Sequence, residues 1–231
     1  MVKLSVIVPA YNEANYIRGI LTSLRKQTFT DFEIIVKDGE SSDETVEVAR
    51  KHADKIISSK DISVSDARNQ GAKHAGGDVL VFADADTILS PNMLQRIADL
   101  MENEKMVGGS CRKIPANRNV LDRLVYEFVN LSTFIGVYLH VGGAHGNCMF
   151  IRRDVFEKIG GFNQKIHIAE EQELVRKAMR FGKFVFLLDY CVMEHPRRLQ
   201  KWGRIKLYTT WLIGTFRSFR VSEKQAYEKV R

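Results

Sequence analysis

Cysteine is scarce in this sequence: its 231 residues include three, Cys111, Cys148 and Cys191. They are odd in number, widely spaced and form no C-x-x-C pair. This pattern argues against a disulfide framework and against a cysteine-based zinc site. We therefore expect three buried, reduced thiols.

Long apolar runs are also absent. The most apolar stretch, residues 131–143, is interrupted by His140 and falls short of the ~18 residues of a membrane span. The chain opens on the run 2–8, which is typical of a β-strand, without the cationic lead and cleavage site of a secretory leader. These features predict a cytoplasmic protein with no membrane-spanning segment.

Acidic residues are fewer than basic ones: 28 Asp and Glu stand against 35 Lys and Arg, a formal net charge of +7. This surplus indicates an anionic partner, and nucleotide phosphates, anionic lipid head groups and nucleic acid all qualify. Nucleic acid is disfavoured because no recognised binding module accompanies the charge. The remaining composition, 45% apolar and 27% charged, is ordinary for a globular protein.

The first half alternates short β-branched runs with amphipathic stretches of helical spacing. It predicts strands at Leu4–Val8, Phe32–Val36, Lys55–Ile57 and Val79–Ala83, and helices at Glu13–Lys26, Asp43–Lys51, Val64–His74 and Pro91–Met101. Such units predict an α/β fold with a doubly wound, mostly parallel sheet. Ligands of such sheets bind at the carboxyl ends of the strands, so the residues after each strand are the candidates for chemistry.

The second half is less regular. It predicts helices at Asn119–Leu139, Asp154–Ile159 and Glu170–Phe181, and strands at Asn147–Ile151, Phe184–Leu188 and Cys191–Met193. A basic, aromatic helix at Lys201–Arg220 follows. We expect a catalytic domain over residues 1–195 and a helical C-terminal extension over residues 196–231.

Acidic side chains follow three of the predicted strands. They belong to the stretches 9–13, 38–43 and 84–86, which the sheet would bring to one edge as an acidic crevice. Carboxylates crowded together repel each other unless a cation binds, and Mg²⁺ or Mn²⁺ takes hard oxygen ligands. A lone D-x-D such as Asp84-Ala85-Asp86 is often only a polar turn, so the surroundings decide its meaning.

Four blocks of sequence supply those surroundings. They are Val6–Glu13, Asp38-Gly39 with Ser41–Asp43, Ala67–Ala72, and Gly77–Asp86. In order and spacing they resemble the family 2 glycosyltransferases of the GT-A fold. Further on, Gly143–Arg152 is similar to the family's acceptor-side strand. The resemblance covers residues 1–195 and implies a nucleotide-diphosphate sugar donor, UDP- or GDP-linked, a divalent cation, Mn²⁺ or Mg²⁺, and inversion at the sugar.

The resemblance also implies roles for individual residues. Asp38 would hydrogen-bond the base, and Arg68 would hold the base or the diphosphate. Asp84 would contact the ribose or the metal region, and Asp86 would ligate the metal directly. The residues implied to line the nucleoside pocket are Pro9, Tyr11 and Glu13.

The family's Glu-Asp block at the head of a helix corresponds to Glu170-Glu171 in this chain. The second position is longer by one methylene, which leaves open whether Glu170 or Glu171 faces the acceptor. Glu171 is our candidate base, which would remove the acceptor proton during a single in-line displacement. A lipid-phosphate acceptor, already ionised at pH 7, would need no base.

Histidines and basic residues near the end of the resemblance have more than one interpretation. His195 is either an additional metal ligand, which imidazole suits, or a structural histidine. His145 either touches a sugar hydroxyl or has no role. Arg197, Arg198 and Trp202 loosely resemble a basic-aromatic motif that other members place over the donor diphosphate.

Two other classes of function compete with a glycosyltransferase. The composition of Lys201–Arg220 favours an ordinary helix packed on the catalytic domain and also suits an interfacial helix, so peripheral association with the inner face of the membrane stays open. A sugar nucleotidyltransferase would need a glycine-rich phosphate loop after the first strand, and residues 9–13 are not one. The donor sugar, the base and the acceptor, a glycan or a lipid, are not determined by the sequence.

Overall fold

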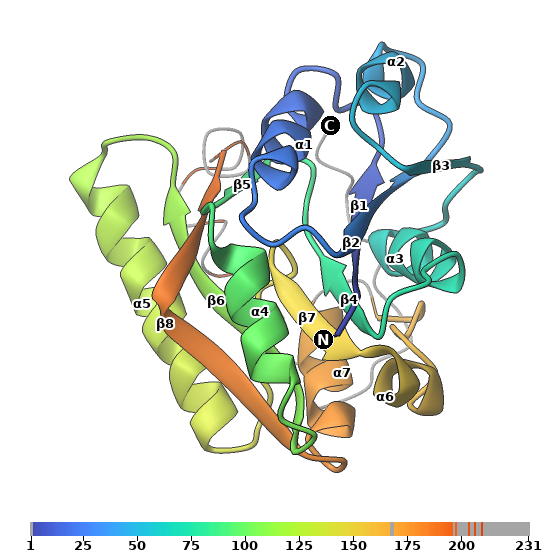
Figure 1. Cartoon of the computed structure of the whole chain (residues 1–231). Helices are drawn as coiled ribbons and strands as arrows, with labels where there is room; N and C mark the ends of the chain where they lie inside the picture. The colour runs from blue at the N-terminus through green and yellow to red at the C-terminus, as the bar shows by residue number, and fades with distance from the viewer. Residues whose placement is uncertain are drawn as a thin grey trace.

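A computed structural model describes residues 2–166, 169–195, 197, 203, 206 and 209. Its centre is an eight-stranded sheet with the order β3-β2-β1-β4-β7-β6-β8-β5 (Figure 1). Strands β1, β2, β3, β4, β6 and β8 run in one direction, and β5 and β7 run in the other. The predicted α/β fold with a mostly parallel sheet is therefore confirmed, and the sheet is mixed in its second half.

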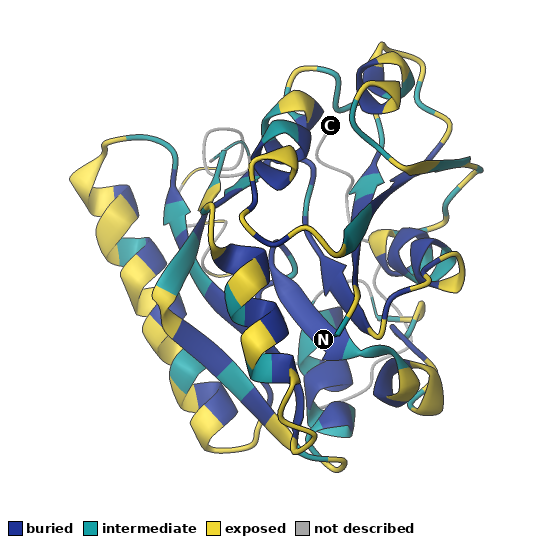
Figure 2. Cartoon of the chain, in the orientation of Figure 1, coloured by how far each residue is buried: buried dark blue, intermediate teal, exposed yellow. Residues whose placement is uncertain are grey.

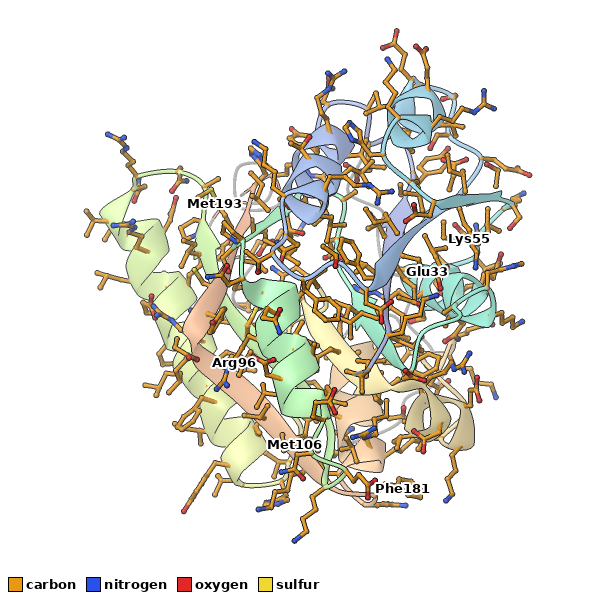
Figure 3. All side chains as sticks on the ribbon, viewed as in Figure 1. Glu33, Lys55, Arg96, Met106, Phe181 and Met193 are labelled. Atoms are coloured by element: carbon orange, nitrogen blue, oxygen red, sulfur yellow. The ribbon has the colours of Figure 1, made fainter. Side chains whose placement is uncertain are left out.

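The parallel half follows the predicted alternation. Its strands are β1 (Leu4–Ala10), β2 (Phe32–Asp38), β3 (Lys55–Ser58) and β4 (Val79–Phe82), and its helices are α1 (Ile17–Arg25), α2 (Thr45–Arg50) and α3 (Val64–Lys73). The β4 residues are buried throughout, as expected of a strand covered on both faces. At the sheet edge, Glu33 and Lys55 pair at 2.8 Å across β2 and β3 (Figure 3).

The second half surrounds the antiparallel strand β7. Its elements are β5 (Thr87–Leu89), α4 (Met93–Met101), β6 (Met106–Pro115), α5 (Val120–Tyr138), β7 (Met149–Arg152), α6 (Arg153–Lys158), α7 (Glu170–Ala178) and β8 (Lys183–Glu194). Strands β5 and β6 were not predicted, and the two predicted runs 184–188 and 191–193 form one strand. Its pairing with β6 shifts register between Cys111 and Arg112.

Strand β6 escaped prediction because glycine weakens the strand signal. A Cβ on Gly109 would lie 2.4 Å from Phe150 Cζ and 2.7 Å from the carbonyl oxygen of Val185. Only a residue without a side chain lets β7 and β8 approach β6 this closely. The glycines that hide the strand in the sequence are therefore the ones that its neighbours require.

Two apolar clusters cover the two faces of the sheet. One joins α1 and α4 to residues such as Val6 and Val81, and the other joins α6 and α7 to Ile7 and Leu80. Figure 2 shows these buried residues along the strands and the inner sides of the helices. Helices on both faces are the doubly wound arrangement that the sequence predicts.

The three thiols are free, with Cys111 and Cys148 buried and Cys191 partly buried. No helix within the described part of the chain is long and apolar enough to cross a membrane. The predicted extension 196–231 lies outside the described residues except for Arg197, Gly203, Lys206 and Thr209, and so do the predicted helix Lys201–Arg220, Arg198 and Trp202.

Candidate active site

The loops after β1, β2 and β4 meet at one edge of the sheet. Glu13 N donates to Thr45 Oγ1 at 2.8 Å, and Asn12 N donates to Ser41 Oγ at 2.9 Å. These bonds tie the loop after β1 to the loop after β2. The carboxyl ends of neighbouring parallel strands share one edge, and the predicted acidic residues gather there.

Arg68 on α3 lies at the centre of the first acidic group. Its Nη2 binds Asp84 Oδ1 at 3.0 Å, and its Nη1 binds Glu170 Oε1 at 3.1 Å and Glu171 Oε1 at 3.0 Å. The side chain is 3% exposed. Burial opposes the charged form, but attraction to the three carboxylates outweighs it and raises the pKa of Arg68. Its predicted contact with the base or the diphosphate stays a prediction.

Glu170 and Glu171 begin helix α7 and differ in accessibility. The side chain of Glu170 is 7% exposed, and that of Glu171 is 15% exposed. The preceding residue, Ala169, has a left-handed backbone with φ of 59° and gives the helix no side-chain cap. Glu171 is thus the more accessible of the two candidate bases.

Arg197 organises a second acidic group that the sequence did not predict. Its Nη1 and Nη2 bind the two carboxylate oxygens of Glu13 at 2.8 and 3.0 Å, and its Nη2 binds Asp86 Oδ2 at 2.8 Å. Burial raises the pKa of Glu13, and the hydrogen bond from Arg197 opposes that rise. In this structure Arg197 neutralises carboxylates, and the diphosphate contact that its motif resemblance implies stays a prediction.

His195 lies beside this group, but its ring does not form a metal-ligand cluster with the carboxylates. Its backbone N donates to Asp86 O at 3.1 Å, and its ring lies 5.3 Å from the ring of Tyr16. Among the described residues, no three His, Cys, Asp or Glu are arranged to hold a metal ion. Mg²⁺ is often bound by one or two carboxylates together with substrate phosphates and water. Asp86 fits that mode, and the predicted role of His195 stays a prediction.

The predicted nucleoside pocket contains a buried ion pair that the sequence did not single out. Asp38 is 1% exposed and accepts from Ser41 N, and a Cβ on Gly39 would lie 3.1 Å from Tyr11 Cδ2 and 2.9 Å from Asp61 Oδ2. The fully buried Lys37 pairs with Asp61 at 2.6 Å. Pro9 lies next to Lys37 in the register of β1 and β2, so Pro9 and Tyr11 lie near this ion pair, whereas Glu13 is bound by Arg197.

The loop before β7, residues 143–147, runs directly past the first acidic group. Gly146 O accepts from Arg68 Nη2 at 3.2 Å, and a Cβ on Gly146 would lie 2.1 Å from Glu171 Oε1. The flanking His145 is buried, and Asn147 Nδ2 donates to Glu194 Oε2 at 3.1 Å. Burial, followed by the nearby Lys113, holds the pKa of His145 well below its ordinary value. Glu194 is a further carboxylate that the sequence reasoning missed.

Comparison with known families decides the identity of this arrangement. The family model described as glycosyl transferase family 2 matches residues 5–160, more than half of the chain. The chain belongs to glycosyl transferase family 2. The matched range includes the four sequence blocks, Arg68, Asp84 and Asp86, whereas Glu170, Glu171 and Arg197 lie beyond it.

Curated relatives of this glycosyl transferase family 2 chain are longer than the chain itself. The uncharacterised glycosyltransferase EpsJ of Bacillus subtilis is 29% identical over 214 residues, which cover 84% of this chain and 62% of EpsJ. The poly(ribitol-phosphate) β-N-acetylglucosaminyltransferase TarS of Staphylococcus aureus is 28% identical over 193 residues, which cover 77% of this chain and 32% of TarS. The chain therefore spans less than two thirds of the length of either protein.

Solved structures share the fold of this family 2 chain. The mannosyltransferase PcManGT of Pyrobaculum calidifontis, in complex with GDP-Man and Mn²⁺, matches with a TM-score of 0.76 at 21% identity, over 97% of this chain and 66% of that chain. TarS in complex with UDP-GlcNAc matches with a TM-score of 0.66 at 22% identity, over 84% of this chain and 59% of that chain. These likenesses confirm the predicted GT-A fold.

Proposed function

We propose that this chain is an inverting glycosyltransferase that moves a sugar from a nucleotide-diphosphate donor to a hydroxyl or a lipid phosphate. The observation that carries the proposal is the meeting of Asp86, Glu13 and the Arg68 group at the carboxyl edge of the sheet in a family 2 chain. Carboxylates there serve two needs of the reaction, binding a cation beside the diphosphate and receiving the acceptor proton.

The donor is a UDP- or GDP-linked sugar in this proposal. Both donor classes occur among the structural neighbours, as GDP-Man with Mn²⁺ in PcManGT and as UDP-GlcNAc in TarS. Asp38 and Tyr11 would receive the nucleoside, with the Lys37–Asp61 pair forming the floor of that pocket. Because Asp38 already accepts from Ser41 N, its carboxylate is held in a fixed orientation for a base N–H.

Asp86 would hold the divalent cation, Mn²⁺ or Mg²⁺, together with the donor phosphates. Such a cation neutralises charge on the departing nucleotide. Arg197 now occupies Asp86 Oδ2, so it competes with a cation for that oxygen. Released from Asp86, its guanidinium would be free to bind the diphosphate, since arginine forks match phosphate oxygens.

Glu171 would act on the acceptor. The acceptor oxygen attacks the anomeric carbon as the bond to the diphosphate breaks, and Glu171 receives the proton of a hydroxyl acceptor. Arg68 holds the Glu171 carboxylate in place, and Gly146 leaves room for it. With a lipid-phosphate acceptor no proton is transferred, and Glu171 would only position the substrate.

A binding panel tests the donor and the cation together. Calorimetry with UDP-, GDP- and dTDP-sugars, with Mn²⁺, with Mg²⁺ and with chelator, is run on the wild type and on Asp86→Ala. We expect one base class to bind, only with a divalent cation, and only to the wild type. Equal affinities with and without metal in both proteins would remove the cation from the proposal.

A second incubation separates the competing enzyme class. A sugar nucleotidyltransferase would form a nucleotide sugar from a sugar 1-phosphate and a nucleoside triphosphate. We expect no such product, because residues 9–13 after β1 are not a glycine-rich phosphate loop. Its formation would replace the transferase proposal.

A further inference from the structure

Helix α5 packs its polar face against the sheet and exposes its apolar face, the reverse of an ordinary surface helix. The residues that it buries are mainly polar or small: Asp122, Tyr126, Asn130, Thr133, Gly136 and Val137. The residues exposed along the helix and at its C-cap, Leu139, are large and apolar: Val120, Leu121, Leu124, Phe128, Leu131, Ile135, Tyr138 and Leu139, between 44% and 75% exposed. We call these eight residues the outer stripe. Figure 2 shows the exposed side of α5 facing away from the sheet.

The outer stripe is continuous. At 100° per residue its eight members fall within an arc of about 100°. The 19 residues of α5 make the stripe about 28 Å long at 1.5 Å per residue. A contiguous apolar face of this size on a globular protein marks an interaction surface.

Polar contacts fix the opposite face of α5 to the sheet. Asn130 Oδ1 accepts from Lys113 N at 3.0 Å, and Asn130 Nδ2 donates to Lys113 O at 3.0 Å. A Cβ on Gly136 would lie 2.3 Å from Gly142 O, which allows no other residue at this contact. The helix therefore cannot rotate to bury the stripe, because its hydrogen-bonded face would then be exposed.

Charge along α5 favours an anionic partner. Arg118 and Arg123 are exposed near its first turn. The acids of the helix are engaged, since Glu127 pairs with Arg112 and Asp122 is buried beside Asn117. No acidic residue lies within the stripe itself.

The surplus basic charge of the chain is concentrated in one segment of the sequence. Segment 197–220 contains seven basic and no acidic residues, so the rest of the chain has 28 Lys and Arg against 28 Asp and Glu. This segment follows β8, and Ala116 N, just before α5, donates to Glu194 O at 2.9 Å.

We propose that the outer stripe of α5 lies on an anionic lipid bilayer, in the plane of its interface, with the exposed Arg118 and Arg123 contributing electrostatic attraction. Interfacial helices bind through an apolar face a few ångströms deep in the head-group region, and basic residues beside it add attraction to anionic lipids. None of the eight stripe residues is among those bound by Arg68 or Arg197, and the inference does not depend on the proposed transfer reaction.

Vesicle sedimentation of the full chain tests the proposal without any nucleotide sugar. The probes are vesicles of phosphatidylcholine alone and of phosphatidylcholine mixed with phosphatidylglycerol, each at low and high salt. The test variant is Leu124→Gln with Phe128→Gln. The control is Ile62→Gln, which removes an apolar side chain of similar exposure, 69% against 67% for Phe128, from the loop between β3 and α3, outside the stripe.

We expect the wild type and Ile62→Gln to sediment with the anionic vesicles, more weakly at high salt. The double variant should lose at least about tenfold in partitioning, because two large apolar side chains no longer enter the interface. Its thermal midpoint should equal that of the wild type, since both positions are exposed.

Four outcomes would overturn the proposal. In the first, the wild type binds neither vesicle, and in the second, the double variant binds as well as the wild type. In the third, the double variant has a lower thermal midpoint than the wild type. In the fourth, the wild type is a dimer and the double variant is a monomer. The third would mean that the chain covers the stripe with its own residues. The fourth, seen by sedimentation equilibrium, would assign the stripe to a second copy.

Discussion

Two arginines hold five carboxylates at the edge of the sheet. Arg68 binds Asp84, Glu170 and Glu171, and Arg197 binds Glu13 and Asp86. Five carboxylates against two guanidinium groups would leave net negative charge for the proposed divalent cation. A bound diphosphate would in turn be repelled unless that cation is present.

Glu171 carries the sharpest prediction at the scale of single residues. Glu171→Gln keeps the shape of the side chain but removes its ability to accept a proton. General-base losses fall at ~10²–10⁴-fold in rate, so turnover with a hydroxyl acceptor should fall that far while the donor dissociation constant stays nearly constant. Glu170→Gln, at a more buried carboxylate, should lose much less. Steady-state rates of both variants are the measurement.

Two other results would change the assignment of the base. If Glu170→Gln is the impaired variant, the roles of the two residues are exchanged. If neither variant loses rate, the acceptor is already ionised, and a lipid phosphate becomes the favoured acceptor.

Arg68 should be far more important for stability than a surface arginine. Arg68→Gln leaves three carboxylates without their cation, and breaking a buried pair costs about 3–5 kcal/mol of unfolding free energy. Arg25→Gln is the matched control, because Arg25 pairs with Asp54 where both side chains are about 40% exposed. An exposed pair contributes about 0–1 kcal/mol. Urea unfolding of both variants compares the two, and similar losses would contradict the central role of Arg68.

At the scale of elements, the loop before β7 packs against the side chains of the candidate site. Gly146 lies against Arg68 and Glu171, so Gly146→Ala would push its methyl group into both side chains. We expect a loss of about 1–3 kcal/mol of unfolding free energy from overpacking and a lower turnover, because Glu171 is displaced. Circular dichroism melting and steady-state rates measure the two effects.

Gly19→Ala is the control for that substitution. Gly19 lies within α1, and a Cβ there would lie 3.6 Å from Ile88 Cγ1, an ordinary contact. Alanine is favoured over glycine inside a helix by about 0.5–1 kcal/mol, so this variant should be slightly more stable and fully active. If Gly146→Ala changes neither stability nor turnover, the loop shifts to accommodate the methyl group without moving Glu171.

At the scale of the whole molecule, the unfolding free energy should depend on pH through His145. Its folded pKa lies well below the ordinary value of 6.5, so below pH 6.5 the unfolded state binds a proton that the folded state does not. Stability is then lost as pH falls, by up to about 1.4 kcal/mol per pH unit. Glu13 acts in the opposite direction, because its pKa is raised on folding.

Comparison with His145→Gln isolates this contribution from that of Glu13. Urea unfolding at neutral pH and about one unit below the ordinary histidine pKa gives the slope for each protein. We expect a smaller loss in the variant than in the wild type. Equal slopes would mean that His145 becomes protonated in the folded state.

Local sequence determined the parallel half and its chemistry. Strands β1 to β4 consist of apolar, β-branched runs, and the helices between them repeat apolar residues every three or four positions. These signals depend only on near neighbours along the chain, so the order of elements and the edge that bears Asp38, Asp84 and Asp86 followed directly. Short motifs in these segments then indicated the family.

Only the tertiary structure decided the second half and the partners of the charges. Strand β6 is held by contacts with distant strands at Gly108 and Gly109, and β8 continues through a register shift. Arg197 meets Glu13 across 184 positions of sequence, and α5 takes its polar face inward because Lys113 offers backbone partners to Asn130. A periodic pattern reports which residues share a face of an element. It contains no information on what that face meets, because that depends on chain segments far away in the sequence.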